Sequence, residues 1–473
     1  MILAINNLSV QYTFVSTFLA GFFGGLLALL MPCIFPMLPL TVGFFTKRYR
    51  DRRKGVRDAL MYGLSIILIY VGLGLIITIL FGPSTLNSIA TNGVFNFCFF
   101  LLLVVFAASF LGGFELNLPN NWINRTEANT HKKGFTGILM MALVLALVSF
   151  SCTGPIIGTL LVQAAANGAR LGPAAGMLGF SMALATPFVL FALFPSWLDS
   201  LPKSGGWMQT LKVTLGFLEL GFSLKFLSNV DLAYHWHLVD REVFLTLWIL
   251  IAACLTVYLL GKLKLSNESE PNGITVPRLF SGILVGAFTL YMVPGLWGAP
   301  LKSISAFLPP MDTQDFILNA NIAVKPDMDF PDVKYANLFK PPLKLNAFFD
   351  FDEGLAYAKK VHKPILVDFT GHACVNCRKM EATVWPDAQV LPIIQNNYVL
   401  IQLYVDDKTV IGNSTIGAIN SAIQANKFNN NSQPDYVLLD DTGKELIPQH
   451  GADYDSAKFA GYLKKGLIIF AAR

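Results

Sequence analysis

Charged residues are scarce in this sequence of 473 residues: they make up 14% of it, whereas hydrophobic residues make up 54%. A soluble protein has about 25% charged residues. The deficit lies almost entirely before residue 303, and the rest has the composition of an ordinary soluble domain. The net charge of +5 is not gathered in basic stretches with interleaved aromatic residues, so nothing favours nucleic acid as a partner. We therefore expect an integral membrane part followed by a globular part.

The N-terminus lacks the positive segment of a secretory signal peptide, since residues 1–46 carry no charged side chain. A membrane-spanning helix needs about 20 apolar residues. Eight segments meet this requirement: 14–40, 59–82, 94–114, 135–164, 171–197, 207–228, 243–261 and 279–300. The sixth contains Glu219 and Lys225, and ionisable residues within a membrane are functional candidates. The chain is therefore expected to lie in a lipid bilayer.

Positive charge is concentrated in the first, third and seventh loops between these segments, above all between residues 47 and 57. Short loops rich in lysine and arginine stay on the cytoplasmic side. An even number of spans then places both termini on the outer side. The soluble C-terminal domain is expected to face the periplasm or the cell exterior.

Two of the expected spans lie in uncharged runs longer than one membrane thickness, up to residue 46 and from 134 to 169. Pro32 and Pro36 flank Cys33 in the first run, and Pro155 follows Cys152 in the second. Interruptions at corresponding places in two halves indicate an inverted repeat with its working site between the halves. We expect repeats of three helices each, with the two cysteines meeting near the membrane centre. The two other membrane cysteines have no such neighbours and are interpreted as small apolar residues.

The segment 303–346 contains six prolines and no clear periodicity. A semi-extended tether fits this composition, and an ordered strap packed against the next domain is the alternative. Beyond it, strands and helices alternate. The expected elements are a helix ending at 361, a strand at 364–369, a helix to about 395, a strand at 398–404, a helix at 418–427, a hairpin of 436–439 with 444–447, and a last helix at 456–467.

Cys374 and Cys377 directly follow the first buried strand and open a helix, which is the redox arrangement of the thioredoxin fold. A helix N-terminus stabilises the attacking thiolate. Cys374 would be the exposed nucleophile, and Cys377 would resolve the mixed disulfide. A zinc half-site is disfavoured because no second Cys-x-x-Cys or suitable histidine pair follows. A purely structural disulfide is equally disfavoured for a two-residue loop at a helix start.

Together these features resemble the DsbD family of transmembrane thiol–disulfide reductases over almost the whole chain. Pro32-Cys33-Ile34-Phe35-Pro36 is similar to the family's first motif, whereas Cys152-Thr153-Gly154-Pro155 lacks the proline that usually precedes this cysteine. The resemblance implies an eight-helix electron-transferring domain, residues 1–303, in which Cys33 and Cys152 form a reversible disulfide. An extracytoplasmic linker, 304–345, and a thioredoxin-like α/β domain, 346–473, would follow.

The resemblance also implies roles in the C-terminal domain. Asp368 corresponds to the buried acid that assists proton transfer at the resolving thiol, and Glu381 to a second acid nearby. Pro434 stands where the fold keeps a cis-proline facing the dithiol, and Ala373 stands where the family usually has an aromatic residue. The family's immunoglobulin-like N-terminal domain has no counterpart before the first span. A separate protein would then serve that step, or the C-terminal dithiol would reduce final targets directly.

The function implied by the resemblance is electron transfer across the inner membrane. Cytoplasmic thioredoxin, supplied from NADPH, would reduce the Cys33–Cys152 disulfide, which would pass two electrons to Cys374–Cys377 and on to extracytoplasmic protein disulfides. Redox-active disulfides would be the only carriers, since no metal, haem or flavin ligand set is apparent. Three alternatives stay open: an oxidase with the opposite flow, a small-molecule transporter with a thioredoxin-like sensor, and a tethered binding or chaperone module.

Overall fold

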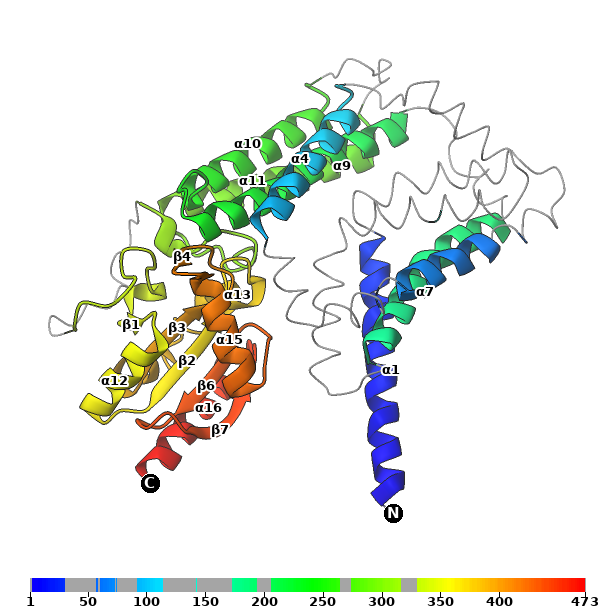
Figure 1. Cartoon of the computed structure of the whole chain (residues 1–473). Coiled ribbons are helices and arrows are strands. Elements are labelled where there is room, and N and C mark those ends of the chain that lie inside the picture. Colours follow the sequence, from blue (N-terminus) through cyan, green and yellow to red (C-terminus); the bar gives the residue numbers. More distant parts are fainter. Residues whose placement is uncertain are drawn as a thin grey trace. The chain divides into compact units, whose positions relative to one another are not determined.

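The computed structural model describes residues 2–29, 57, 60–72, 74, 92–113, 142, 172–193, 206–263, 274–315 and 330–472 (Figure 1). The chain divides into two compact units. The first takes in 1–90, 101–220 and 264–274, and the second takes in 91–100, 221–263 and 275–473.

The first unit contains two closely packed apolar helices, α1 (Ile2–Ala28) and α7 (Gly172–Leu193). Glycines allow the close approach: a Cβ atom at Gly21 would collide with the backbone of Gly176, and one at Gly179 with that of Phe18. Small residues at such contacts are typical of helix pairs in membranes. Helix α1 begins at Ile2, before the expected first span at residue 14.

Four helices of the described part are long and apolar enough to cross a membrane. They are α4 (Gly93–Phe110), residues Gln209–Tyr234 of α9 (Gly206–Tyr234), α10 (Arg241–Leu259), and α11 (Val276–Met292) continued by the 3-10 turn η1 (Val293–Trp297). Shorter apolar helices cover Val15–Ala28, Leu60–Gly72 and Ala174–Pro187. All of these overlap expected spans, and the total of eight spans stays a prediction.

The C-terminal part of the second unit is built on a five-stranded sheet of order β1-β3-β2-β6-β7 (Figure 1). The strands are β1 (Ala347–Phe348), β2 (Ile365–Thr370), β3 (Val399–Tyr404), β6 (Asp435–Leu439) and β7 (Glu445–His450). The central strand β2 pairs in parallel with β3 and antiparallel with β6. Two further short strands, β4 (Val410–Ile411) and β5 (Ser414–Thr415), pair separately. This strand order, with helices on both faces, is that of a thioredoxin-like domain.

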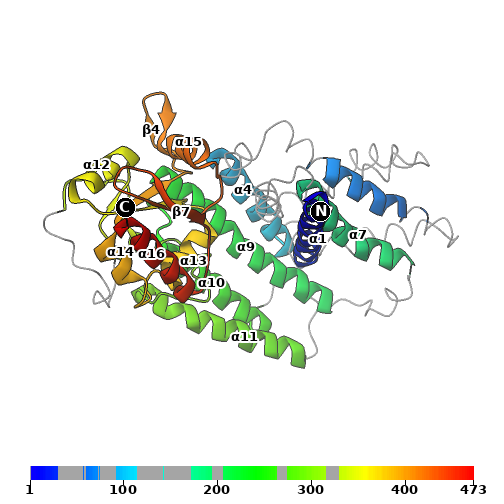
Figure 2. The same ribbon diagram turned by 90° about the horizontal axis from the view of Figure 1, so that it is seen from below.

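Helices cover both faces of the sheet (Figure 2). They are α12 (Phe351–Val361), α13 (Val375–Thr383), α14 (Leu391–Asn397), α15 (Ile416–Phe428) and α16 (Ser456–Ala471). Alternate residues of β2 face opposite ways, so Leu366 packs in the cluster with α13, α14 and α16, whereas Val367 packs in the cluster with α12 and α15. The expected strands and the hairpin are confirmed.

The expected continuous helix from the dithiol to about residue 395 is wrong. Helix α13 ends at Thr383, and α14 starts only at Leu391. Between them, Trp385 and Val390 are fully buried in the core. Pro386 cannot donate a helical backbone hydrogen bond, so the chain leaves the helix here and turns these side chains inward.

Two parts of the proline-rich segment are described, 303–315 and 330–346, and the second is an ordered strap. Phe339 and Leu345 are 3% and 2% exposed and belong to the core of the C-terminal domain. The Phe339 ring stacks on that of Tyr404 with centroids 4.6 Å apart. Of the two readings of the sequence, the packed strap fits these residues, because apolar side chains without helical or strand periodicity can still be buried one by one.

Candidate redox site

Cys374 and Cys377 form a disulfide at the N-terminus of α13, with Cα atoms 5.3 Å apart. Cys374 is the N-cap residue, and its Sγ accepts a hydrogen bond from the backbone N–H of Cys377 at 3.1 Å. Cys377 is 1% exposed, whereas Cys374 is half-buried. A thiolate at Cys374 would therefore meet both the helix dipole and an N–H donor, and it is the sulfur that a partner can reach.

The loop before the dithiol is held by Asp406, which follows strand β3. Its two carboxylate oxygens accept the backbone N–H groups of His372 and Ala373, at 2.8 and 2.9 Å. A Cβ atom at Gly371 would lie 2.9 Å from the same carboxylate, so a glycine is needed for this approach. Asp406 was not among the expected site residues, and the only sequence signal for it was an acidic pair after a buried strand.

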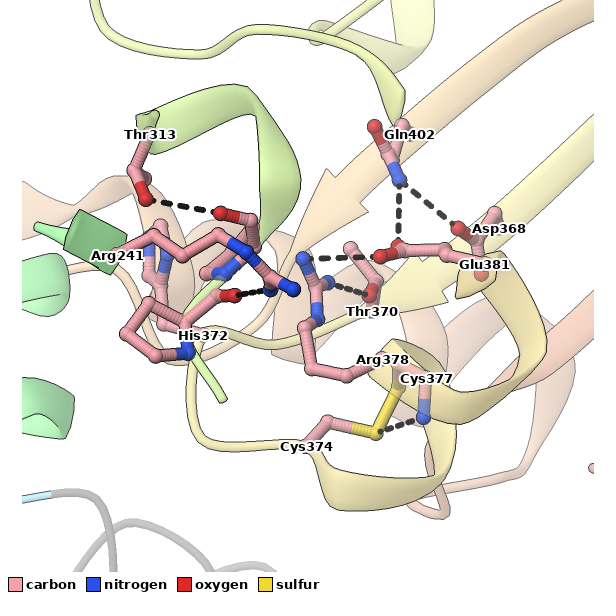
Figure 3. Close-up of polar contacts among 12 residues, drawn as sticks. Arg241, Thr313, Asp368, Thr370, His372, Cys374, Cys377, Arg378, Glu381 and Gln402 are labelled. Atoms are coloured by element: carbon pink, nitrogen blue, oxygen red, sulfur yellow. Dashed lines mark hydrogen bonds and ion pairs between the residues drawn. A yellow bond between two sulfur atoms is a disulfide. The ribbon is translucent and has the colours of Figure 1, made fainter. Parts of the chain in front are cut away.

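Asp368, on β2, and Glu381, on the dithiol helix α13, are both buried and share one donor. The side-chain amide of Gln402 donates to Asp368 Oδ2 at 3.2 Å and to Glu381 Oε1 at 3.3 Å (Figure 3). Asp368 is 1% exposed, and its Oδ1 has no hydrogen-bond partner in the described part of the chain. Burial raises the pKa of the Asp368 carboxyl to about 7, even though the bond from Gln402 favours the ionised form. This carboxyl can therefore take up and release a proton near neutral pH.

Arg378 lies beside the two acids and pairs with Glu381. Its Nη1 lies 3.0 Å from Glu381 Oε2, and its Nη2 donates to Thr370 Oγ1 at 3.1 Å. Burial raises the pKa of the Glu381 carboxyl to about 8, even though the Arg378 guanidinium opposes that rise. The pair with Arg378 favours the ionised form of Glu381, and burial leaves both acids with pKa values near neutral pH. Arg378 was not among the expected site residues.

The peptide bond between Gln433 and Pro434 is cis, as the sequence analysis expected. Pro434 directly precedes β6, the strand beside β2. On α13, the side chain of Asn376 accepts a hydrogen bond from the hydroxyl of Tyr454 at 2.8 Å. Asn376 lies between the two cysteines, so this contact fixes one side of the dithiol loop.

The expected membrane-site residues lie outside the described residues: Cys33, Cys152, Pro32, Pro36 and Pro155. Their roles therefore stay predictions. Cys98 and Cys254, which the sequence analysis set aside, are free cysteines in the described part of the chain.

Apolar helices joined to a thioredoxin-like domain with a disulfide at a helix N-terminus define a multi-pass membrane protein with a thiol–disulfide exchange site. Two family models match the chain: the cytochrome C biogenesis protein transmembrane domain over residues 15–230, and the thioredoxin-like domain over residues 351–467. The first of these is a DsbD-type membrane domain. Over both of these parts the chain is similar to the DsbD family of thiol:disulfide interchange proteins.

Curated relatives carry the same family name. The chain is similar to thiol:disulfide interchange protein DsbD of Pseudoalteromonas atlantica, with 26% identity over 447 residues, covering 92% of this chain and 65% of that protein. It is 29% identical over 389 residues to DsbD 2 of Pseudomonas aeruginosa, covering 79% of this chain and 59% of that protein. DsbD of Ralstonia nicotianae is 24% identical over 374 residues, which are 77% of this chain and 56% of that protein. The chain thus spans less than two thirds of the length of these relatives.

Proposed function

We propose that this protein is a protein-disulfide reductase that carries reducing equivalents across the inner membrane to disulfides on the outer side. The observation that carries the proposal is the Cys374–Cys377 disulfide at the start of α13, with a buried carboxyl at Asp368 whose pKa is about 7. It belongs to a chain whose residues 15–230 match a DsbD-type membrane domain. The names of the curated relatives, thiol:disulfide interchange proteins, support the same chemistry.

The proposed route uses two successive exchanges. Cytoplasmic thioredoxin, reduced at the expense of NADPH, reduces the Cys33–Cys152 disulfide and is itself oxidised. A thiolate of this membrane pair then attacks the Cys374–Cys377 disulfide and forms a mixed disulfide, and the second membrane thiolate resolves it. Two electrons pass outward, the membrane pair becomes a disulfide again, and the C-terminal pair takes up two protons as it becomes a dithiol.

The output step runs from Cys374. Its thiolate attacks a disulfide of an extracytoplasmic protein, and the thiol of Cys377 then displaces the reduced target from the mixed disulfide. That second attack needs a base, because the thiol must lose its proton before it can act. Asp368 is the acceptor we assign, since burial keeps its proton affinity close to neutral pH. Glu381 pairs with Arg378 next to this carboxyl.

The proposed topology has eight spans, with both termini and the thioredoxin-like domain in the periplasm. The dense positive cluster between residues 47 and 57 supports a cytoplasmic first loop. We further propose the domain limits 1–303, 304–345 and 346–473, with the lipid bilayer around the first. Thioredoxin and extracytoplasmic disulfide-bearing proteins would be the partners, and cysteine pairs would be the only redox carriers.

The test is the redox state of Cys374–Cys377 in cells, read by alkylation-shift in wild type and in Cys33→Ala. We expect a mostly reduced pair in wild type and an oxidised pair in the variant. Cys98→Ala, which removes a free cysteine of another membrane helix, is the matched control and should behave as wild type. An unchanged pair in Cys33→Ala would refute the route, and the opposite change would indicate an oxidase.

A further inference from the structure

Two histidines and a carboxylate meet outside the dithiol site, at His235, His372 and Asp407. The Nε2 atom of His235 lies 2.8 Å from Oδ2 of Asp407, and the Nε2 atom of His372 lies 3.1 Å from the same oxygen. The three atoms that could bind a metal all lie within 4.8 Å of one another. The three residues come from segments far apart in the sequence, so tertiary structure, not a local turn, brings them together.

The side chains of this cluster are buried and held by their surroundings. Their exposed fractions are 15% for His235, 7% for His372 and 0% for Asp407. The backbone N–H of Thr409 donates to Oδ1 of Asp407 at 2.9 Å, which leaves Oδ2 to the histidines. The ring of His372 stacks on Tyr404 with centroids 4.5 Å apart. Packing therefore fixes the three groups in a converging arrangement.

The two neighbouring acids after β3, Asp406 and Asp407, make different contacts. Asp406 is fully used by the backbone of the dithiol loop, through the N–H groups of His372 and Ala373. Asp407 makes no bond to that backbone in the described part of the chain and faces the two imidazoles instead. One acid thus shapes the loop, and the other is available as a ligand.

We propose that His235, His372 and Asp407 form a binding site for a divalent transition-metal ion of the Zn²⁺ class. Two imidazole nitrogens and one carboxylate oxygen are ligands that such ions take in three-residue sites, where a fourth position stays open to water. Tetrahedral ligands at about 2.0–2.1 Å from zinc lie about 3.4 Å apart. The separations here, from 2.8 Å up to 4.8 Å, bracket that value, so only small side-chain shifts would admit the ion.

The three residues of the cluster come from the end of a membrane helix and from the region of the dithiol, so a bound ion would link the two. His235 directly follows α9, whose residues Gln209–Tyr234 are a candidate membrane span, and His372 lies two residues before Cys374. A backbone bond from Lys408 N to Ala233 O, at 3.1 Å, joins the same two regions. A bound ion would therefore link the dithiol loop to the end of a membrane helix. This link would oppose movement of the loop away from that helix.

The experiment is a Zn²⁺ titration of the full chain in detergent, after removal of metals by a chelator. The protein is first oxidised so that Cys374–Cys377 is a disulfide, and remaining thiols are alkylated, so that no cysteine can bind zinc. Competition with a chromogenic chelator should report one equivalent bound. Co²⁺ should give the visible absorption of a four-coordinate nitrogen and oxygen site.

Variants decide whether the cluster is the site. His235→Ala and Asp407→Asn should weaken Zn²⁺ binding by at least about tenfold. His237→Ala is the matched control: His235 and His237 have φ values of 53° and 54°, so alanine is equally strained at both, and His237 is exposed. His372→Gln keeps an N–H donor for Asp407 but removes the imidazole. It should keep the fold, shown by a single elution peak, and should still lose zinc.

Absence of stoichiometric binding to the oxidised wild type would overturn the proposal and leave the cluster as hydrogen bonds alone. Unchanged binding in His372→Gln, or equal loss in His237→Ala, would overturn it as well. The titration uses no thiol chemistry. Its failure would leave the proposed electron route standing, and failure of the Cys33→Ala test would leave the metal site standing.

Discussion

Replacing Asp368 by asparagine should change how the second step of disulfide exchange depends on pH. The carboxyl has a pKa of about 7, against an ordinary value of 3.8. As the base for the Cys377 thiol it would be about one tenth ionised at pH 6 and about nine tenths at pH 8. The wild-type rate should therefore rise about tenfold between these values and level off above pH 8.

Without this base the thiol must ionise unaided. For a cysteine with a pKa of about 8.5, the thiolate fraction rises nearly tenfold with each unit of pH increase, as long as the pH is below the pKa. Asp368→Asn should thus be about 10²-fold slower at pH 7, a typical loss for a missing general base. Its rate should climb by a factor of nearly one hundred from pH 6 to pH 8 without a plateau.

A single-turnover assay isolates the step. Cys374 is converted to a mixed disulfide with thionitrobenzoate, and release of the coloured thiol by Cys377 is followed in the full chain with the other four cysteines replaced by alanine. Asp435→Asn is the control, because Asp435 is also a buried acid but accepts its bond from Gln424, at 3.1 Å. A rise with its midpoint near pH 7 that persists in Asp368→Asn would refute the assignment of the base.

Two stability predictions follow, each read by the urea dependence of pulse proteolysis on the full chain in detergent. Arg378→Met should destabilise the C-terminal domain by about 3–5 kcal/mol, because the Glu381 carboxylate is left buried without its ion pair at 3.0 Å. Adding Glu381→Gln should recover much of the loss, and no recovery would contradict the pairing. Gly354→Ala should cost about 1–3 kcal/mol, because its Cβ would lie 2.5 Å from side-chain carbons of Ile401. Gly461→Ala, with open space around it in α16, should gain about 0.5–1 kcal/mol, and equal effects of the two would contradict this account.

Sequence patterns were sufficient for the sheet and the dithiol. The runs at Ile365–Thr370 and Val399–Tyr404 are buried at every residue, and mostly apolar runs of this length are typical of strands covered on both faces. The break after Thr383 was missed because Val384 and Trp385 fit a helix locally, and only the tertiary core pulls them inward. The membrane cysteines lie outside the described residues, so their pairing is still a prediction.

The groups around the dithiol could not be foreseen in the same way. Gln402 bonds to Asp368 from a position 34 residues away, and Asp406 to the loop N–H of His372 over the same separation. Neither spacing is a motif, because strands β2 and β3 become neighbours only in the folded sheet. Arg378 lies next to Cys377 in the sequence, but only burial shows that its charge is directed at Glu381 and not at solvent.

The strap before the sheet has a consequence for taking the protein apart. A fragment that starts at residue 346 would lack Phe339 and Leu345, two side chains of its own core. Burial of such a side chain contributes about 1.5–3 kcal/mol, so the loss of each of the two would lower the stability of the fragment. The rings of Tyr404 and His372, which Phe339 stacks against, would also lose a neighbour close to Cys374. A reduction potential measured on that fragment would then describe a dithiol loop that lacks its contact with Phe339. A fragment that starts at residue 330 would keep this contact.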